Sequence, residues 1–196
     1  MGWKKIFGFG KKRDVLGDDI AKEMGFSHDV LDIVKHVSNN NYQHLTVRNL
    51  YNEGEIEVEG ISFSTSKNEA EKLVIQLQSK LRPLEYSVFI SEHTNNKICK
   101  VGVIKGDDQF EILKIQQTNG DNYDIGNDDV IDKLKEWNKK YPFTIIGADY
   151  DWVEVHFKVI PNDNDLKSFA QEIYEFCPDI VVARLESGHE EPRMRE

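Results

Sequence analysis

Two carboxylates on one predicted hairpin turn are the residues best suited to chemistry in this sequence. Asp149 and Asp151 stand two positions apart, and His156 follows in the next alternating run. Carboxylates so close together can share a metal ion, or divide the acid and base roles if their surroundings differ. These three residues are therefore candidate catalytic groups of a metal-assisted hydrolase. The alternative is structural, because aspartates commonly form turns.

A second polar loop, residues 118–124 (TNGDNYD), is a candidate binding loop. Its Asn-Gly pair predicts a turn, and loops held by a rigid scaffold often carry function. Asp121 and Asp124 are also candidate metal ligands, although Tyr123 stands where a calcium loop requires Asp or Asn. The alternative is a turn whose side chains bind their own backbone. With two hairpin residues, the candidate binding set is Thr118, Asn119, Gly120, Asn122, Tyr123, Asp124, Trp152 and Glu154.

Trp152 is of interest because its strand phase places it off the predicted core face, and exposed tryptophans are common in binding hot spots. Cys177 comes at a predicted helix end, where the helix dipole raises a thiol pKa, so we expect a core residue and not a nucleophile. The sequence contains no nucleophile elbow, dinucleotide fingerprint, phosphate loop or zinc pattern. We therefore expect no cofactor.

Composition narrows the class of partner. The 196 residues hold 35 acidic and 25 basic side chains, for a formal net charge of -10. An acidic body repels phosphate backbones, so we expect no nucleic acid. A protein partner, basic in charge, is one hypothesis for the acidic surface, and solubility alone is the alternative. The two cysteines, Cys99 and Cys177, have no metal-type spacing and suit a reducing cytoplasm. No apolar run approaches the ~20 residues of a membrane-spanning helix.

The two ends of the chain differ from the body. Residues 1–16 are basic and aromatic, which indicates either a flexible segment or weak contact with an anionic membrane surface. Residues 184–196 are polar and without periodicity, so we expect a disordered tail, for which a shifted reading frame is one explanation. The candidate membrane-contact residues are Trp3, Lys4, Lys5, Phe7, Lys11, Lys12 and Arg13.

Periodicity predicts the elements that must position these residues. Strands are expected at 55–63, 86–91, 98–104, 143–148, 152–160 and 180–182, with a bulge at Gly60 where the apolar phase flips. Helices are expected near 17–25 and 28–37, from a Ser66–Glu69 capping box to Pro83, within 107–117, from Asn127 or Asp128 to Pro142, and from Asp163 or Asn164 to Cys177. Alternating helices and hairpins predict an α+β fold whose antiparallel or mixed sheet is covered by helices on one face. The expected order is a ferredoxin-like β-α-β-β-α-β, and a pseudo-repeat of the two halves is an open alternative.

Three segments, TNGDNYD, LKEW and FCPDIV, resemble a bacterial family known as domain of unknown function 4253 (DUF4253), over roughly residues 85–183. The resemblance implies a small cytoplasmic bacterial protein and carries no activity or residue role. The expected organisation is a basic segment at 1–16, an N-terminal α/β region at 17–84, the family-like domain at 85–183 and the tail at 184–196.

Three functions remain in competition. The leading hypothesis is a non-enzymatic, immunity-like or regulatory protein-interaction module, because the chain is acidic and has no complete catalytic signature. The alternatives are the metal-assisted hydrolase and a small-ligand-binding domain that uses residues 118–124.

Overall fold

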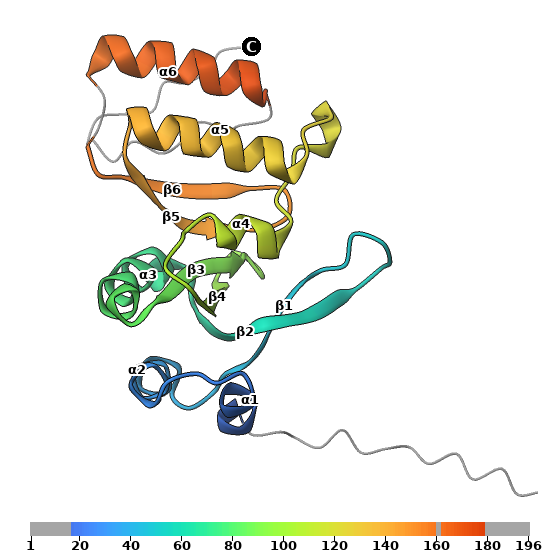
Figure 1. Ribbon diagram of the computed structural model, residues 1–196, viewed down its shortest axis with the longest axis vertical. Helices are drawn as coiled ribbons and strands as arrows, with labels where there is room; N and C mark the ends of the chain where they lie inside the picture. The colour runs from blue at the N-terminus through green and yellow to red at the C-terminus, as the bar shows by residue number, and fades with distance from the viewer. Residues whose placement is uncertain (1–16, 160–161, 179–196) are drawn as a thin grey trace, which may run out of the picture. The chain divides into compact units, whose positions relative to one another are not determined.

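The computed structural model describes residues 17–159 and 162–178, in two compact units, 1–158 and 159–196 (Figure 1). The first unit holds the sheet and both candidate loops, and the second unit contributes one described helix. The expectations for the basic segment 1–16, the strand 180–182 and the tail 184–196 lie outside the described residues.

The first unit is built on a six-stranded sheet with the spatial order β1-β2-β4-β3-β5-β6. Four of the five neighbouring pairs are antiparallel, and β3 pairs with β5 in parallel, which makes the sheet mixed. The α+β class with a mixed sheet is therefore confirmed. The strands are β1 (Gln43–Arg48), β2 (Glu55–Ser66), β3 (Tyr86–Glu92), β4 (Ile98–Lys105), β5 (Phe143–Ala148) and β6 (Val153–Phe157).

The helices lie close to where periodicity predicts them, but their caps differ. Gly126, not Asn127 or Asp128, is the N-cap of α5, and its N–H donates to the Asp129 carboxylate. Asn162 caps α6 by accepting from the Asp165 N–H. The described helices are α1 (Gly17–Glu23), α2 (His28–Ser38), α3 (Lys67–Leu81), α4 (Glu111–Gln116), α5 (Asn127–Lys140) and, in the second unit, α6 (Asp163–Phe176), with short 3-10 turns η1 (Arg82–Leu84) and η2 (Asp121–Tyr123).

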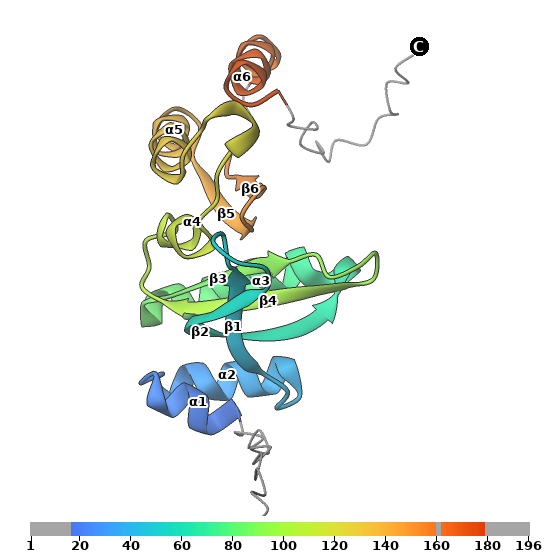
Figure 2. The same ribbon diagram turned by 90° about the vertical axis from the view of Figure 1, so that its right-hand side faces the viewer.

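Helices cover both faces of the sheet, so the expectation of one covered face is wrong. Every residue from Tyr86 to Ser91 in β3 is buried, and alternate residues of a strand point to opposite faces. Val88 and Ile90 join a core with α2 and α3, whereas Phe89 points the other way, and α4 packs against β1, β3 and β5. Figure 2 shows α2 and α4 on opposite sides of β1 and β2. A central strand that is apolar on both faces requires other elements, here helices, to pack on each face.

Strand β1 is absent from the sequence-based prediction. Its residues QHLTVR do alternate, and Leu45 and Val47 are buried while Arg48 is exposed. The expected bulge at Gly60 is confirmed, because β1 pairing shifts from His44–Ile61 to Leu45–Val58 and leaves two extra residues in β2. A Cβ on Gly60 would come within 2.9 Å of a Leu45 methyl group, so the bulge needs glycine.

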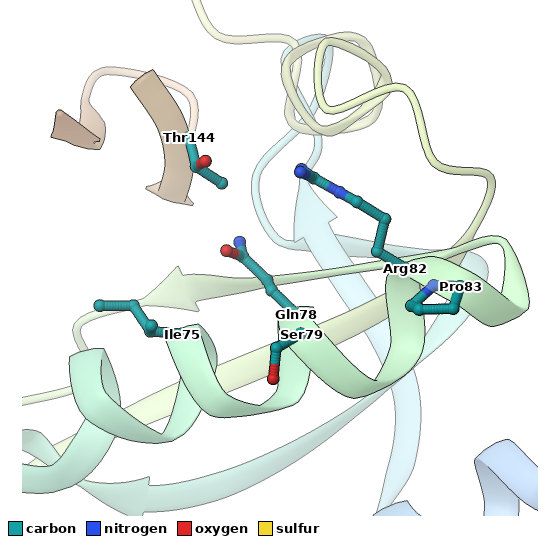
Figure 3. Close-up of a pocket in the computed structure, with 6 residues that line it drawn as sticks. All are labelled: Ile75, Gln78, Ser79, Arg82, Pro83 and Thr144. Atoms are coloured by element: carbon teal, nitrogen blue, oxygen red, sulfur yellow. The ribbon is translucent and has the colours of Figure 1, made fainter. Parts of the chain in front are cut away.

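Strands β3 and β5 share one paired position, Ile90 with Gly147. Beyond that position a side-chain amide connects them, because Gln78 of α3 donates from Nε2 to the Val88 and Ile145 carbonyls, both at 2.8 Å. Figure 3 shows Gln78 at the edge of a shallow hollow of about 390 Å³, with Thr144 of β5 opposite. Few backbone hydrogen bonds therefore join the β5–β6 hairpin to β3, and the Gln109 side chain adds another attachment by accepting from the Ile145 N–H at 2.9 Å.

Candidate functional site

The two loops singled out by sequence lie side by side. The Asn119 N–H donates to the Tyr150 carbonyl at 2.8 Å, which joins residues 118–124 to the β5–β6 turn. The turn itself is closed by the Asp149 N–H, which donates to the Trp152 carbonyl at 3.0 Å. Asp149 Oδ1 also accepts from the Tyr150 N–H at 2.8 Å. Two hydrogen-bonded turns thus form one surface at the end of β5 and β6.

Residues 118–124 form a turn that binds its own backbone, as the structural alternative proposed. Asn119 Oδ1 accepts from the Asp121 N–H at 3.1 Å, and the Gly120 N–H donates to the Ile125 carbonyl at 2.9 Å. Thr118 is buried, whereas Tyr123 is 39% exposed. The exposed loop residues available to a partner are Asp121, Asn122, Tyr123 and Asp124.

Charged side chains from four further strands gather beside the β5–β6 turn. Lys100 of β4 forms an ion pair with Glu92 of β3 at 2.5 Å and lies 3.8 Å from Glu55 of β2. The Arg48 guanidinium lies 4.0 Å from the centre of the Tyr150 ring. We call this group the acidic junction, and it comprises Arg48, Glu55, Glu92, Lys100, Asp149 and Asp151.

The electrostatics of the acidic junction favour an added cation. Burial raises the pKa of Asp149, and the charges of Asp151 and Glu92 raise it further, against a lowering by the Tyr150 N–H and Arg48. Burial opposes the charged form of Lys100, but the hydrogen bond and charge of Glu92 outweigh it and raise the Lys100 pKa. The group thus contains four carboxylates and two cations, and burial together with like charge opposes the ionised form of Asp149.

We expect Asp149→Asn to raise the melting temperature at pH about 7 and to leave it unchanged near pH 3. Because the folded-state pKa of Asp149 is raised, ionisation costs stability as pH rises from the unfolded-state pKa through the folded-state pKa. The amide removes that cost and keeps the oxygen that accepts from Tyr150. Thermal unfolding at both pH values tests this, with exposed Asp132→Asn as the control. A lower melting temperature at neutral pH would contradict it.

A second cluster lies on the α3 side of the sheet, and sequence reasoning missed it. His93 Nδ1 is 3.2 Å from Cys99 Sγ, and His93 Nε2 is 4.0 Å from a Glu154 carboxylate oxygen. The Trp152 ring stacks on His93 with centroids 4.7 Å apart. We call His93, Cys99, Trp152 and Glu154 the thiol cluster. A thiol, an imidazole and a carboxylate in this order are the groups of a nucleophilic relay.

The environment of Cys99 argues against such a relay. The thiol is fully buried, and burial raises its pKa. Burial and the charge of Lys67 lower the pKa of His93, so thiol and imidazole are both neutral near pH 7. A protonated, inaccessible thiol is a poor nucleophile. The thiol cluster is therefore a packed polar contact beneath the start of α3.

We expect iodoacetamide to leave Cys99 unmodified in the folded protein and to label Cys177, which is partly exposed. Alkylation requires an accessible thiolate, and the Cys99 thiol is buried and therefore not accessible to the reagent. Peptide mass spectrometry after labelling, with and without denaturant, measures both sites, and Cys177→Ser removes the competing thiol. Rapid labelling of native Cys99 would contradict the structural role.

The proposed catalytic residues have different partners. Asp149 belongs to the acidic junction, whereas exposed His156 lies 3.9 Å from Glu71 of α3. Within residues 17–159 and 162–178, no three His, Cys, Asp or Glu side chains lie close enough together to hold a metal ion. The hypothesis of a metal-assisted hydrolase required residues 118–124 and the β5–β6 turn to lie together, and they do. In this part of the chain, however, no set of side chains is arranged to bind a metal ion.

The expectation that Trp152 lies off the core is wrong. Trp152 is partly buried against the main core, and a Cβ on Gly147 would come within 2.8 Å of its ring. The alternation of residues along β6 gave the wrong prediction because both faces of this strand are partly buried. Val153 and Val155 are no more buried than Glu154. Burial also raises the pKa of Glu154, with a further rise from Glu71 and an opposing effect of Lys67.

Sequence reasoning missed Arg48, Glu55, Glu92 and Lys100, which come from four different strands. One signal was available: Lys100 interrupts an otherwise apolar strand between Cys99 and Val101, both buried. A lysine in such a strand requires acidic partners. Nothing local identifies those partners.

The fold and site define an α+β protein with a mixed sheet and an acidic loop surface at one end of it. Residues 100–192, just under half of the chain, match the family described as "Domain of unknown function (DUF4253)". The matched segment includes Lys100, both candidate loops and the β5–β6 hairpin. No curated protein and no solved structure matches the chain. Among the described helices, none has the length and apolar character needed to cross a membrane.

Proposed function

We propose that this protein is a non-enzymatic interaction module that binds a basic segment of a partner protein at the acidic junction. The observation that carries the proposal is the charge imbalance there: Lys100 pairs with Glu55 and Glu92, while Asp149 also experiences the like charges of Asp151 and Glu92. An arriving lysine or arginine would offset the repulsion among Asp149, Asp151 and Glu92. Complementary charge of this kind speeds association and selects partners.

The neighbouring loop supports the same proposal. Asp121 and Asp124 are exposed beside the junction, and Tyr123 is partly exposed between them. The loop is already ordered by its own hydrogen bonds, so binding would require little further loss of conformational entropy. Cytoplasmic action is part of the proposal and is supported by Cys99 and Cys177, which are both free thiols.

Native mass spectrometry of the protein purified gently from its own host tests the proposal. We expect one protein to co-purify at fixed stoichiometry with the wild type. The Asp149→Asn/Asp151→Asn double variant should lose it, because two carboxylates of the junction become neutral. The control is Glu23→Gln/Asp132→Asn, which changes net charge equally at two exposed helix positions.

The outcomes separate the candidate functions. Equal recovery of the partner by both double variants would contradict binding at the acidic junction. A bound metal ion in place of a protein would instead favour the metal-assisted hydrolase. Once the partner is purified, affinity should fall with rising salt, because exposed charge pairs are screened.

A further inference from the structure

The tip of the β1–β2 hairpin presents apolar side chains to solvent. Tyr51 is 91% exposed and Leu50 is 44% exposed, and Ile56 near the start of β2 is 39% exposed. Single exposed apolar residues are ordinary, but three within seven positions on one hairpin are a local cluster. We call residues 49–54 the hairpin tip; in Figure 1 it is the loop that joins β1 to β2.

Hydrogen bonds hold the hairpin tip in one conformation. Asn49 Oδ1 accepts from the Tyr51 N–H at 3.0 Å and from the Asn52 N–H at 3.2 Å. The Asn49 N–H donates to the Gly54 carbonyl at 3.0 Å, and Gly54 has a φ of 110°, which favours glycine. Tyr51 is therefore presented by an ordered turn, and fixing it in a complex costs little entropy.

The residues that follow Tyr51 along the hairpin are acidic, and no lysine or arginine lies among them. Residues 49–59 include four glutamates and no lysine or arginine. Arg48, at the base of the tip, lies over Tyr150, and Lys100 pairs with Glu92 and Glu55. The base of the tip thus belongs to the acidic junction, and its apex adds an aromatic group to the same charged surface.

We propose that Tyr51, supported by Leu50, anchors the partner protein by entering a hydrophobic pocket whose rim carries lysine or arginine. This inference rests on the proposed interaction function and names its apolar contact. Tyrosine is enriched at binding hot spots because it buries a large rigid ring at low entropic cost. The glutamates around it would face the basic rim. A second copy of this chain is a poor occupant, because the net charge of -10 and the acidic hairpin repel each other.

Photo-crosslinking in host cells tests the anchor. The photoreactive amino acid p-benzoylphenylalanine is placed at position 51 and, as the control, at position 174, because Tyr174 of α6 is 58% exposed. We expect position 51 to crosslink to one protein that position 174 does not reach. That protein, purified, should bind the wild type. Tyr51→Ala should weaken binding by roughly 10- to 100-fold, whereas Tyr51→Phe and Tyr174→Ala should change it less than about 3-fold.

The results distinguish the anchor from the proposed function. If Tyr51→Ala binds as the wild type does while Asp149→Asn/Asp151→Asn loses binding, the anchor is wrong and the interaction function stands. A crosslink at position 51 only to another copy of this chain overturns the anchor. Absence of a crosslink at position 51 overturns it as well, and if native mass spectrometry also finds no protein partner, the interaction function falls with it.

Discussion

Gly147→Val will destabilise the protein by roughly 2–4 kcal/mol. A Cβ at position 147 would lie 2.8 Å from the Trp152 ring and 3.2 Å from Ile90 Cβ. The ring cannot withdraw easily, because it is stacked on His93 and packed against the core. Position 147 is also where β3 and β5 pair, so displacement there weakens their junction. Urea unfolding followed by tryptophan fluorescence measures the loss.

Gly126→Ala is the matched control for that prediction. Its added Cβ would meet the Asp129 carboxylate at 3.3 Å, and that group can move. We expect a change below about 1 kcal/mol. If Gly147→Val lost no more than Gly126→Ala, the close approach of Trp152 to the β5 backbone would not constrain the fold.

Gln78→Leu is expected to cost about 2–3 kcal/mol, because two backbone carbonyls lose their donor. The Gln78 amide spans β3 and β5 beyond their single paired position, and it donates to Val88 and Ile145 at 2.8 Å each. Leucine matches glutamine in size but donates nothing. Water in the adjoining open hollow can reach part of this site, which keeps the cost below that of two fully buried carbonyls.

Gln76→Leu provides the comparison for Gln78, because Gln76 lies on the exposed face of the same helix. It should change stability by less than about 0.5 kcal/mol. Equal unfolding midpoints for the two variants would mean that the amide does not connect the strands. Denaturant unfolding of both variants under one set of conditions gives the answer.

Local periodicity predicted the elements whose burial is one-sided. Helix α5 buries Val130, Ile131, Leu134 and Trp137 along one stripe, which the sequence pattern identifies directly. Strand β1 was missed because its alternation covers only six residues. The sequence also did not predict that helices pack on both faces of β3, because an unbroken apolar strand does not indicate how many of its faces are covered.

The site was predictable only in pieces. The Asp149–Trp152 turn and residues 118–124 carry turn signals, so each loop is visible in the sequence. Their contact depends on one backbone hydrogen bond between Asn119 and Tyr150, and no residue type encodes it. Lys100 and its acidic neighbours are brought together by sheet order, which local patterns do not determine. The phase argument for Trp152 failed because it assumed that only one face of β6 is covered.

The narrow attachment of the β5–β6 hairpin has a consequence for local stability. Strands joined along a full ladder open together. The β5–β6 hairpin has one paired position with β3 and side-chain hydrogen bonds from Gln78 and Gln109, so fewer backbone hydrogen bonds hold it than hold the other strands, and burial of β5 residues such as Ile145 opposes its opening. If it opens on its own, the hairpin behaves as a separate cooperative unit, with amide protons that exchange sooner than those of β2, β3 and β4. Since it carries Asp149 and Asp151, a partner bound there would slow that exchange, and folding of the hairpin would be thermodynamically linked to binding.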